Sequence, residues 1–192
     1  MVGLEPSCLL TLRDELPALL PGDAADTLAA SSLLFEEFLV RELTSTESAS
    51  GDSPADGGKP NGCLGKLQQL QQNFNANGRT YLVHAHCHQK AFNLAGTVET
   101  VMKLIPGATV KMIDSSCCGM AGSFGYHHET LAVSKQMAEL DLLPAIAAET
   151  DAVLVADGTS CRHQIRDLAG REARHVARVL QEALLPESRQ QT

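Results

Sequence analysis

The sequence predicts an α/β fold: a small parallel sheet with flanking helices and metal-site loops at the C-terminal ends of the strands. Short apolar runs alternate with longer amphipathic segments three times after residue 80, which is the order of a parallel sheet with helical crossovers. Cysteines follow the end of each apolar run. The 192 residues are 44% hydrophobic without any tryptophan, and abundant Ala and Leu favour helices packed on a sheet over an all-β sandwich.

The first 43 residues predict a helical segment. Val2–Leu4 reads as a short strand that turns into a helix at Ser7, and a Pro-Gly-Asp turn follows at residues 21–23. From Asp23 to Leu43 apolar residues recur at helical spacing, which predicts one helix packed on a core; they are Leu28, Leu33, Leu34, Phe35, Phe38, Leu39 and Val40. Because no segment precedes Val2 to pair with the strand, we expect residues 1–43 to be the tail of a larger unit.

Residues 44–79 differ in character from both neighbours. Ser, Thr, Asp, Gly and Pro dominate up to residue 65, with almost no large apolar side chain. This composition predicts a flexible linker or a long surface loop. Cys63 lies at its far end, and we expect its side chain to face solvent.

The segment 80–185 predicts the strand–helix units. Strands are expected at residues 81–85, 108–113 and 151–156, and helices at residues 92–105 and 127–143, with one helix or a pair of helices from about residue 162 to 185. In the second of these helices Leu131, Val133, Met137 and Leu140 are expected to face inward. The polar residues 186–192 predict a frayed tail.

Four cysteines follow the predicted strands. Cys87 comes after the first strand, the adjacent pair Cys117 and Cys118 after the second, and Cys161 after the third. Because the carboxyl ends of parallel strands share one edge of a sheet, these thiols are expected to converge there. Gly119, Gly122 and Gly125 would let the backbone turn sharply and approach a metal cluster closely.

Four converging thiolates suit either a tetrahedral zinc ion or an iron–sulfur cluster. The spacing contains no C-x-x-C pair, so it matches neither a zinc finger nor a ferredoxin-type run, and buried reduced cysteines remain an alternative. Disulfides are disfavoured in a chain of this size without an export signal. His86, His88 and His163 flank the cysteines and could ligate, donate hydrogen bonds to sulfur or move protons, with an indirect role favoured for each.

Other ionisable residues give weaker signals. His84 is expected to be an ordinary strand residue and His175 a surface residue of the last helix. Lys90, Arg162 and Arg166 could offset the negative charge of a thiolate-bound cluster. The glycine spacing differs from the dinucleotide fingerprint, and no paired carboxylates or Ser-His-Asp set can be argued from the spacing.

Net charge and hydropathy limit the partners and the location. A formal charge of −8 argues against nucleic acid as the main partner, because phosphate binding needs a basic surface. We find no apolar run long enough to span a bilayer and no signal peptide. We therefore expect a cytoplasmic protein, with a peripheral place at the inner membrane as the alternative.

Three motifs strongly resemble the cysteine-rich CCG domain. They are HCHQK at residues 86–90, CCGMAGSFGY at residues 117–126 and DGTSCRHQI at residues 157–165, and the likeness covers most of residues 80–184. The domain occurs in heterodisulfide reductase B subunits, glycolate oxidase iron–sulfur subunits and anaerobic glycerol-3-phosphate dehydrogenase C subunits. The strongest likeness is to the C-terminal part of fused FAD-linked oxidases of the D-lactate and D-2-hydroxyglutarate dehydrogenase type. EPSC at residues 5–8 resembles the closing cysteine segment of a preceding copy of the repeat.

The resemblance implies that Cys87, Cys117, Cys118 and Cys161 ligate an iron–sulfur cluster of the 4Fe-4S type, or zinc in some members. It extends a cofactor-binding role to Gly119, Gly122, His86, His88 and His163. The family pattern often ends in C-x-x-C, but here Gln164 replaces the second cysteine, which counts against a cluster that needs five cysteines. Cys8 would belong to the other half-site.

The resemblance further implies an electron-relay role. FAD is expected on an upstream domain or a partner subunit, and electrons would pass through this chain to a quinone or another acceptor. No catalytic residue is expected here, and the chain alone should not oxidise a substrate. Two alternatives stay open: a zinc-bound structural domain that docks the flavoprotein, and a thiol-based disulfide reductase in which Cys117 or Cys118 reacts.

Overall fold

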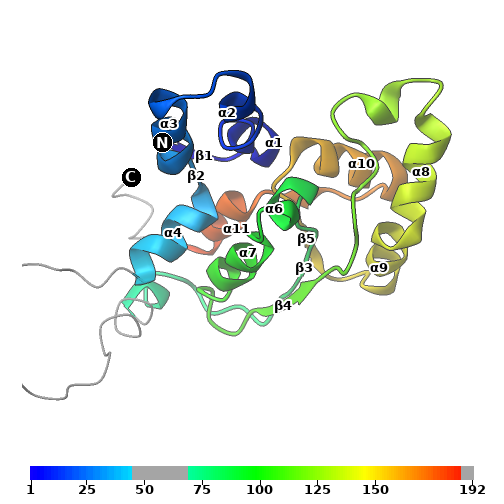
Figure 1. The fold of residues 1–192 in the computed structure, drawn as a ribbon. Helices are drawn as coiled ribbons and strands as arrows, with labels where there is room; N and C mark the ends of the chain where they lie inside the picture. Colours follow the sequence, from blue (N-terminus) through cyan, green and yellow to red (C-terminus); the bar gives the residue numbers. More distant parts are fainter. Residues whose placement is uncertain (45–68, 187–192) are drawn as a thin grey trace, which may run out of the picture.

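The computed structural model describes residues 1–44 and 69–186 (Figure 1). Its main sheet has four parallel strands in the order β4-β3-β5-β6: β3 Thr80–Val83, β4 Thr109–Met112, β5 Val153–Val155 and β6 Ala173–Arg174. A second, two-stranded parallel sheet pairs β1 Val2–Gly3 with β2 Leu33–Leu34. The predicted α/β class with a small parallel sheet and flanking helices is therefore confirmed, and β6 adds a strand to the three that were predicted.

The helices follow the strands in sequence. In the N-terminal part they are α1 Pro6–Leu10, α2 Glu15–Leu19, α3 Asp23–Ser31 and α4 Phe35–Thr44. Around the main sheet they are α6 Cys87–Ala91, α7 Ala95–Met102, α8 Leu131–Leu140, α9 Leu142–Ala148, α10 Thr159–Ala169 and α11 Val176–Ala183, with a 3-10 turn η1 at Phe124–Tyr126. The helix predicted at residues 92–105 is the single helix α7, and the one predicted at residues 127–143 is divided between α8 and α9. The last segment, predicted as one helix or a pair, is the pair α10 and α11, separated by β6.

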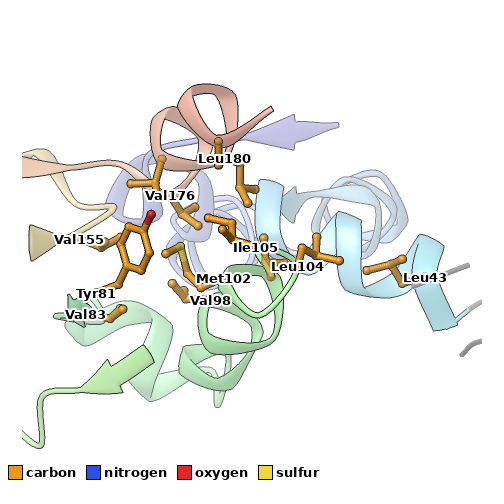
Figure 2. Close-up of a cluster of buried hydrophobic side chains, with 13 residues drawn as sticks. Leu43, Tyr81, Val83, Val98, Met102, Leu104, Ile105, Val155, Val176 and Leu180 are labelled. Carbon is orange, nitrogen blue, oxygen red and sulfur yellow. The ribbon is translucent and has the colours of Figure 1, made fainter. Parts of the chain in front are cut away.

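The main sheet is covered on both faces. Tyr81, Val83 and Val155 project to the face where α7, α11 and α4 pack, and Figure 2 shows their side chains against Val98, Met102, Ile105, Val176 and Leu180. Leu82 and Leu154 alternate to the opposite face, where α9 and α10 contribute Leu142, Ile146 and Ile165. This period-2 alternation gives the central strands β3 and β5 two buried faces, as expected for a parallel sheet, whereas the edge strand β4 exposes Thr109 and Lys111.

The structure corrects the single helix predicted from Asp23 to Leu43. Leu33 and Leu34 leave the helical path and form β2, which pairs with Val2 and Gly3. Ser32 lies in an extended conformation between the segments and is fully buried. The residues of β1 that pair with Leu33 and Leu34 lie 31 positions earlier in the sequence, so local apolar spacing alone cannot signal the pairing.

The structure also corrects the orientation of the segment 127–143. Leu131, Val133 and Leu140 are exposed, with 69% of Leu140 accessible, whereas Ser134 and Ala138 form the buried face of α8. Ser134 lies where the backbone of the Cys117–Gly119 loop approaches α8 closely, and Met137, the fourth residue predicted to face inward, is half-buried beside Gly119.

Most of the predicted linker lies outside the described residues, and so do Cys63 and residues 187–192 of the predicted tail. Within the described part, Phe74 forms an antiparallel bridge with Leu184 and packs on the same core as α7 and α11. No helix among the described residues has the length and the apolar character that crossing a bilayer requires.

Candidate metal centre

Three neighbouring strands bring four cysteines to one edge of the sheet. Cys87 is the first residue of α6 after β3, and Cys161 is the third residue of α10 after β5. Cys117 and Cys118 lie in the loop after β4. Because β4, β3 and β5 are adjacent and parallel, their carboxyl ends place these segments side by side.

The four sulfurs form a continuous series. Hydrogen bonds link Cys87 to Cys117, Cys117 to Cys118, and Cys118 to Cys161. Cys118 and Cys161 are buried, whereas Cys87 and Cys117 are half-buried, and all four are free of disulfides. The predicted convergence of four thiols on one place is thus present in the structure.

The sulfurs alternate between thiol and thiolate. Hydrogen bonding to Cys117 raises the pKa of Cys87 and that of Cys118, and burial raises both further. The hydrogen bond from Cys118 instead lowers the pKa of Cys117 and that of Cys161, against the effect of burial. Two thiolates, Cys117 and Cys161, are therefore favoured without a metal, and a bound cation would displace the two remaining protons.

Local backbone geometry positions the paired cysteines. Gly119 has φ +90°, and a Cβ atom there would lie 2.3 Å from the carbonyl oxygen of Ser134 on α8. Its backbone N–H donates to the Cys117 sulfur over 3.4 Å. Gly122 also has a positive φ, +64°, but has open space around it. The close approach that Gly119 permits is therefore to α8.

Positive electrostatic elements surround the sulfurs. Cys87 and Cys161 lie in the first turns of α6 and α10, where the helix N-terminus favours a thiolate. The Lys90 ammonium donates to the backbone carbonyl oxygens of Ser115 and Ser116, which fixes the loop that leads into Cys117. Burial lowers the pKa of Lys90, and the nearby cysteines partly oppose this effect.

The three histidines named from the sequence occupy different places. His86 Nδ1 lies 3.9 Å from the Cys87 sulfur and accepts a hydrogen bond from the His88 backbone N–H as the cap of α6. The His88 ring packs edge-on against Phe92 and lies near the exposed carboxylates of Asp14 and Glu15. His163 Nδ1 lies 3.4 Å from the Tyr126 hydroxyl, in an exposed contact. Of these three, His86 alone has a described contact with one of the four sulfurs.

His84 is the residue that sequence reasoning missed. It directly follows β3 and is 1% exposed, and its side chain lies with the sulfurs of Cys118 and Cys161, all three donor atoms within 4.8 Å of one another. The alternation of side chains along the strand could have revealed it. His84 follows Leu82 by two residues, so the two side chains point to the same face of the sheet, and that face also contains Cys118 and Cys161.

Gln164 and Cys8 lie apart from the sulfur series. The buried Gln164 amide donates to the Cys118 carbonyl oxygen at 3.0 Å and to the Ser134 carbonyl and hydroxyl oxygens on α8. It therefore supports the loop backbone where the family pattern often has a cysteine. Cys8 is exposed on α1.

The two arginines named from the sequence have backbone or surface partners. Arg162 donates to the carbonyl oxygens of Ala156 and Asp157, at the end of β5. Arg166 pairs with the exposed Asp167. Neither has a described contact with a cysteine sulfur.

A buried polar cluster connects the N-terminal part to the cysteine loops. The Gln89 amide donates to Glu36 at 2.6 Å and to Asp157 at 3.0 Å, while its oxygen accepts from the His86 backbone N–H. Asp157 also accepts from the Val176 backbone N–H. Burial, together with the Asp157 charge, raises the pKa of Glu36 to about 7.

Residues 81–166 match the family model of the cysteine-rich domain CCG, and this range includes all four cysteines of the series. The match covers less than half of the 192 residues and shows that this part of the chain is similar to the CCG domain. The D-2-hydroxyglutarate dehydrogenases of Pantoea ananatis (strain AJ13355) and Escherichia coli (strain K12) are 26% and 24% identical over 186 residues, 96% of this chain. The C subunit of the anaerobic glycerol-3-phosphate dehydrogenase of Escherichia coli (strain K12) is 27% identical over 101 residues, 53% of this chain.

These relatives are much longer than the chain. The matched region is 15% of the length of each of the two D-2-hydroxyglutarate dehydrogenases and 25% of the length of the glycerol-3-phosphate dehydrogenase relative. No solved structure gives a significant match. The comparisons therefore relate this chain to a small region of larger dehydrogenases.

Proposed function

We propose that this chain is the iron–sulfur-binding, electron-transfer region of an FAD-linked 2-hydroxyacid dehydrogenase or oxidase. The observation that supports this most is the series of four sulfurs, because four cysteine thiolates are the usual ligand set of a 4Fe-4S cluster. Cys87, Cys117, Cys118 and Cys161 would be the ligands. A cluster held there supplies one-electron transfer, and the chain itself supplies the ligands, their burial and the surrounding dipoles.

The burial of the four cysteines supports relay rather than substrate chemistry. Cys118 and Cys161 are buried, while Cys87 and Cys117 remain half-accessible, so the site has a protected interior and one side near the surface. That arrangement lets electrons arrive and leave while the bound group stays shielded from bulk water.

The rest of the assembly is proposed from the relatives. We place FAD on a dehydrogenase domain or subunit that oxidises a 2-hydroxy acid, as the name D-2-hydroxyglutarate dehydrogenase suggests for the long relatives. Electrons would leave through this chain to a quinone or a comparable acceptor. Such an assembly would work in the cytoplasm, with peripheral contact to the inner membrane if the acceptor is a membrane quinone.

We also propose that residues 1–43 are the closing part of a preceding repeat and that residues 80–185 are the complete one. The elements β1, α1, β2 and α4 have the same order and parallel pairing as β5, α10, β6 and α11. Cys8 is the third residue of α1, and Cys161 is the third residue of α10. Cys8 therefore occupies the position that would serve a second, upstream site.

Metal and acid-labile sulfide analysis of anaerobically purified protein tests the relay function. We expect iron with sulfide and a brown visible spectrum, lost together in Cys117→Ser and Cys118→Ser. Cys8→Ser is the matched control, because this exposed thiol lies outside the sulfur series, and it should keep both. Zinc without sulfide would refute the relay and support the structural docking domain.

Absence of any metal after anaerobic reconstitution would reject both metal-binding hypotheses. The thiol-based reductase hypothesis would then gain support if a small disulfide trapped Cys117 or Cys118 as a mixed disulfide. The half-buried position of Cys117 beside a second thiol is the feature that this chemistry requires.

A further inference from the structure

His84 has a ring nitrogen that the protein leaves unpaired. Its backbone N–H continues the sheet by donating to the Val155 carbonyl oxygen at 2.9 Å, and its Nδ1 lies 3.0 Å from the Ser115 hydroxyl. Among the side chains that the structure describes, His84 Nε2 is the one buried nitrogen or oxygen without a hydrogen-bond partner. Burying such a group unpaired costs about 1–3 kcal/mol, so the position needs an explanation.

The unpaired nitrogen belongs to the sulfur site. One ring nitrogen of His84 and the sulfurs of Cys118 and Cys161 lie within 4.8 Å of one another, and all three residues are buried. Because Nδ1 is the nitrogen that contacts the Ser115 hydroxyl, we take Nε2 as the nitrogen available to a ligand at the sulfurs. Nitrogen and sulfur ligands around a tetrahedral zinc ion lie about 3.5–3.8 Å apart, given metal bonds of about 2.0–2.3 Å. Side-chain movements of about 1 Å would close the three atoms around one ion.

The surroundings of Ser115 fix the ring in this orientation. The Lys90 ammonium lies 3.3 Å from the Ser115 hydroxyl and donates to the Ser115 carbonyl oxygen, so the hydroxyl oxygen is held in place. Its two lone pairs can accept from Lys90 and from His84 Nδ1–H. A proton on Nδ1 leaves the lone pair of Nε2 directed at Cys118 and Cys161, as in metal-ligating histidines whose other nitrogen is hydrogen-bonded.

We propose that His84 Nε2 is a direct metal ligand, together with Cys118 and Cys161. Cys117, the next sulfur in the series, would complete a three-sulfur, one-nitrogen set, and half-buried Cys87 would remain outside it. The inference does not rest on the proposed 4Fe-4S cluster, whose ligands would be the four cysteines. It concerns the single ion that the same site would hold in place of a cluster, and a mixed nitrogen and sulfur set suits a zinc-type ion.

Metal loading of reduced, metal-free protein tests this ligand set. Zn²⁺ alone is added to the wild type, to His84→Ala and to His128→Ala, which removes an exposed histidine from the loop before α8. X-ray absorption at the zinc edge should show three sulfurs and one nitrogen with imidazole scattering in the wild type and in His128→Ala. His84→Ala should lose the imidazole scattering and bind Zn²⁺ at least ~100-fold more weakly, since loss of outer-shell partners alone costs 10–100-fold.

Wild-type protein labelled with ¹⁵N-histidine gives a second measurement that does not depend on the variant folding. Zn²⁺ should shift the Nε2 resonance of one buried histidine, and Ser115→Ala should weaken binding by about 10-fold without abolishing that shift. Four sulfurs without nitrogen in wild-type protein would overturn the inference and leave the metal site intact. Failure of the wild type to bind Zn²⁺ would also overturn it. An iron–sulfur cluster formed anaerobically on the four cysteines would support the proposed function, and the Zn²⁺ measurements would still decide whether His84 is a ligand of a single ion.

Discussion

Replacing Glu36 by glutamine should stabilise the protein at alkaline pH. The Glu36 carboxyl is 1% exposed, accepts from the Gln89 amide and faces the buried Asp157 carboxylate across that amide. Glu37 of the same helix adds a further negative charge nearby. Burial and these charges oppose ionisation, so the folded protein holds a proton on Glu36 that the unfolded chain releases.

The sign and the size follow from the pKa. Folding raises the Glu36 pKa from 4.5 to about 7. The contribution of protonated Glu36 to the free energy of unfolding is therefore complete below pH 4.5 and is lost as pH rises through about 7. At 1.36 kcal/mol per tenfold change in proton affinity, the full effect is up to about 3 kcal/mol. Glutamine keeps an oxygen for the Gln89 amide but carries no charge, so it avoids this loss.

Unfolding of reduced, metal-free protein between pH 5 and pH 8 measures the effect. Glu36→Gln should be more stable than wild type by up to about 3 kcal/mol at pH 8, a rise in Tm of about 6–12 °C, and by less than about 1 kcal/mol at pH 5. Glu139→Gln on the exposed face of α8 is the control and should follow the wild type at every pH. Parallel pH curves for Glu36→Gln and wild type would refute the argument, because the cysteine titrations are common to both.

Three further predictions concern contacts around the site. Gly119→Ala should destabilise the protein by more than about 3 kcal/mol in urea unfolding, because a Cβ at φ +90° would lie 2.3 Å from the Ser134 carbonyl oxygen. Gly122→Ala has a strained backbone but no clash, so it should lower the free energy of unfolding by about 1–2 kcal/mol. Equal losses in the two variants would contradict the steric argument for Gly119. Gln164→Leu should cost about 1–3 kcal/mol, since it removes the donor to the carbonyl oxygens of Cys118 and Ser134; a neutral result would show that these groups have other partners. Burial raises the pKa of Glu5, but the hydrogen bonds from Thr159 and Ser7 outweigh this effect, so the pKa in the folded protein is lowered. The ionised Glu5 therefore adds to the free energy of unfolding above pH 4.5, and this contribution is lost as pH falls through the pKa of the folded state. Glu5→Gln should therefore cost about 1 kcal/mol at pH 7, with a smaller difference toward pH 3 in the same assay, and an unchanged difference would argue against capping by the carboxylate.

The positions of the four cysteines could be predicted because they depend on topology. Parallel strands joined by helices place their carboxyl ends on one edge, so Cys87, Cys117, Cys118 and Cys161 could be brought together without any knowledge of side-chain packing. The fold class followed from the same alternation. His84 was missed because it was treated as an ordinary strand residue, although the alternation from Leu82 places it on the face of the sheet that contains Cys118 and Cys161.

The two wrong predictions share a physical cause. Leu33 and Leu34 have helical spacing with their neighbours, yet they pair with Val2 and Gly3, and the distant partner decides their conformation. On α8, a hydrophobic pattern placed Val133 and Leu140 inward, whereas the approach of Gly119 to Ser134 requires small residues on that face. Amphipathic spacing reports a helix face reliably only where the opposing surface can accommodate large side chains.

The contacts of the N-terminal part show why it belongs with the site. Glu5 accepts from the backbone N–H of Thr159 at 2.8 Å, two residues before Cys161, and so caps the helix that carries this cysteine. Glu36 accepts from the Gln89 amide, two residues after Cys87, and the same amide donates to Asp157, two residues after β5. The segments that carry Cys87 and Cys161 are thus fixed relative to each other partly by residues 1–44. A change in the packing of that N-terminal part would act first on the separation of these two sulfurs, and hence on the metal they are proposed to bind.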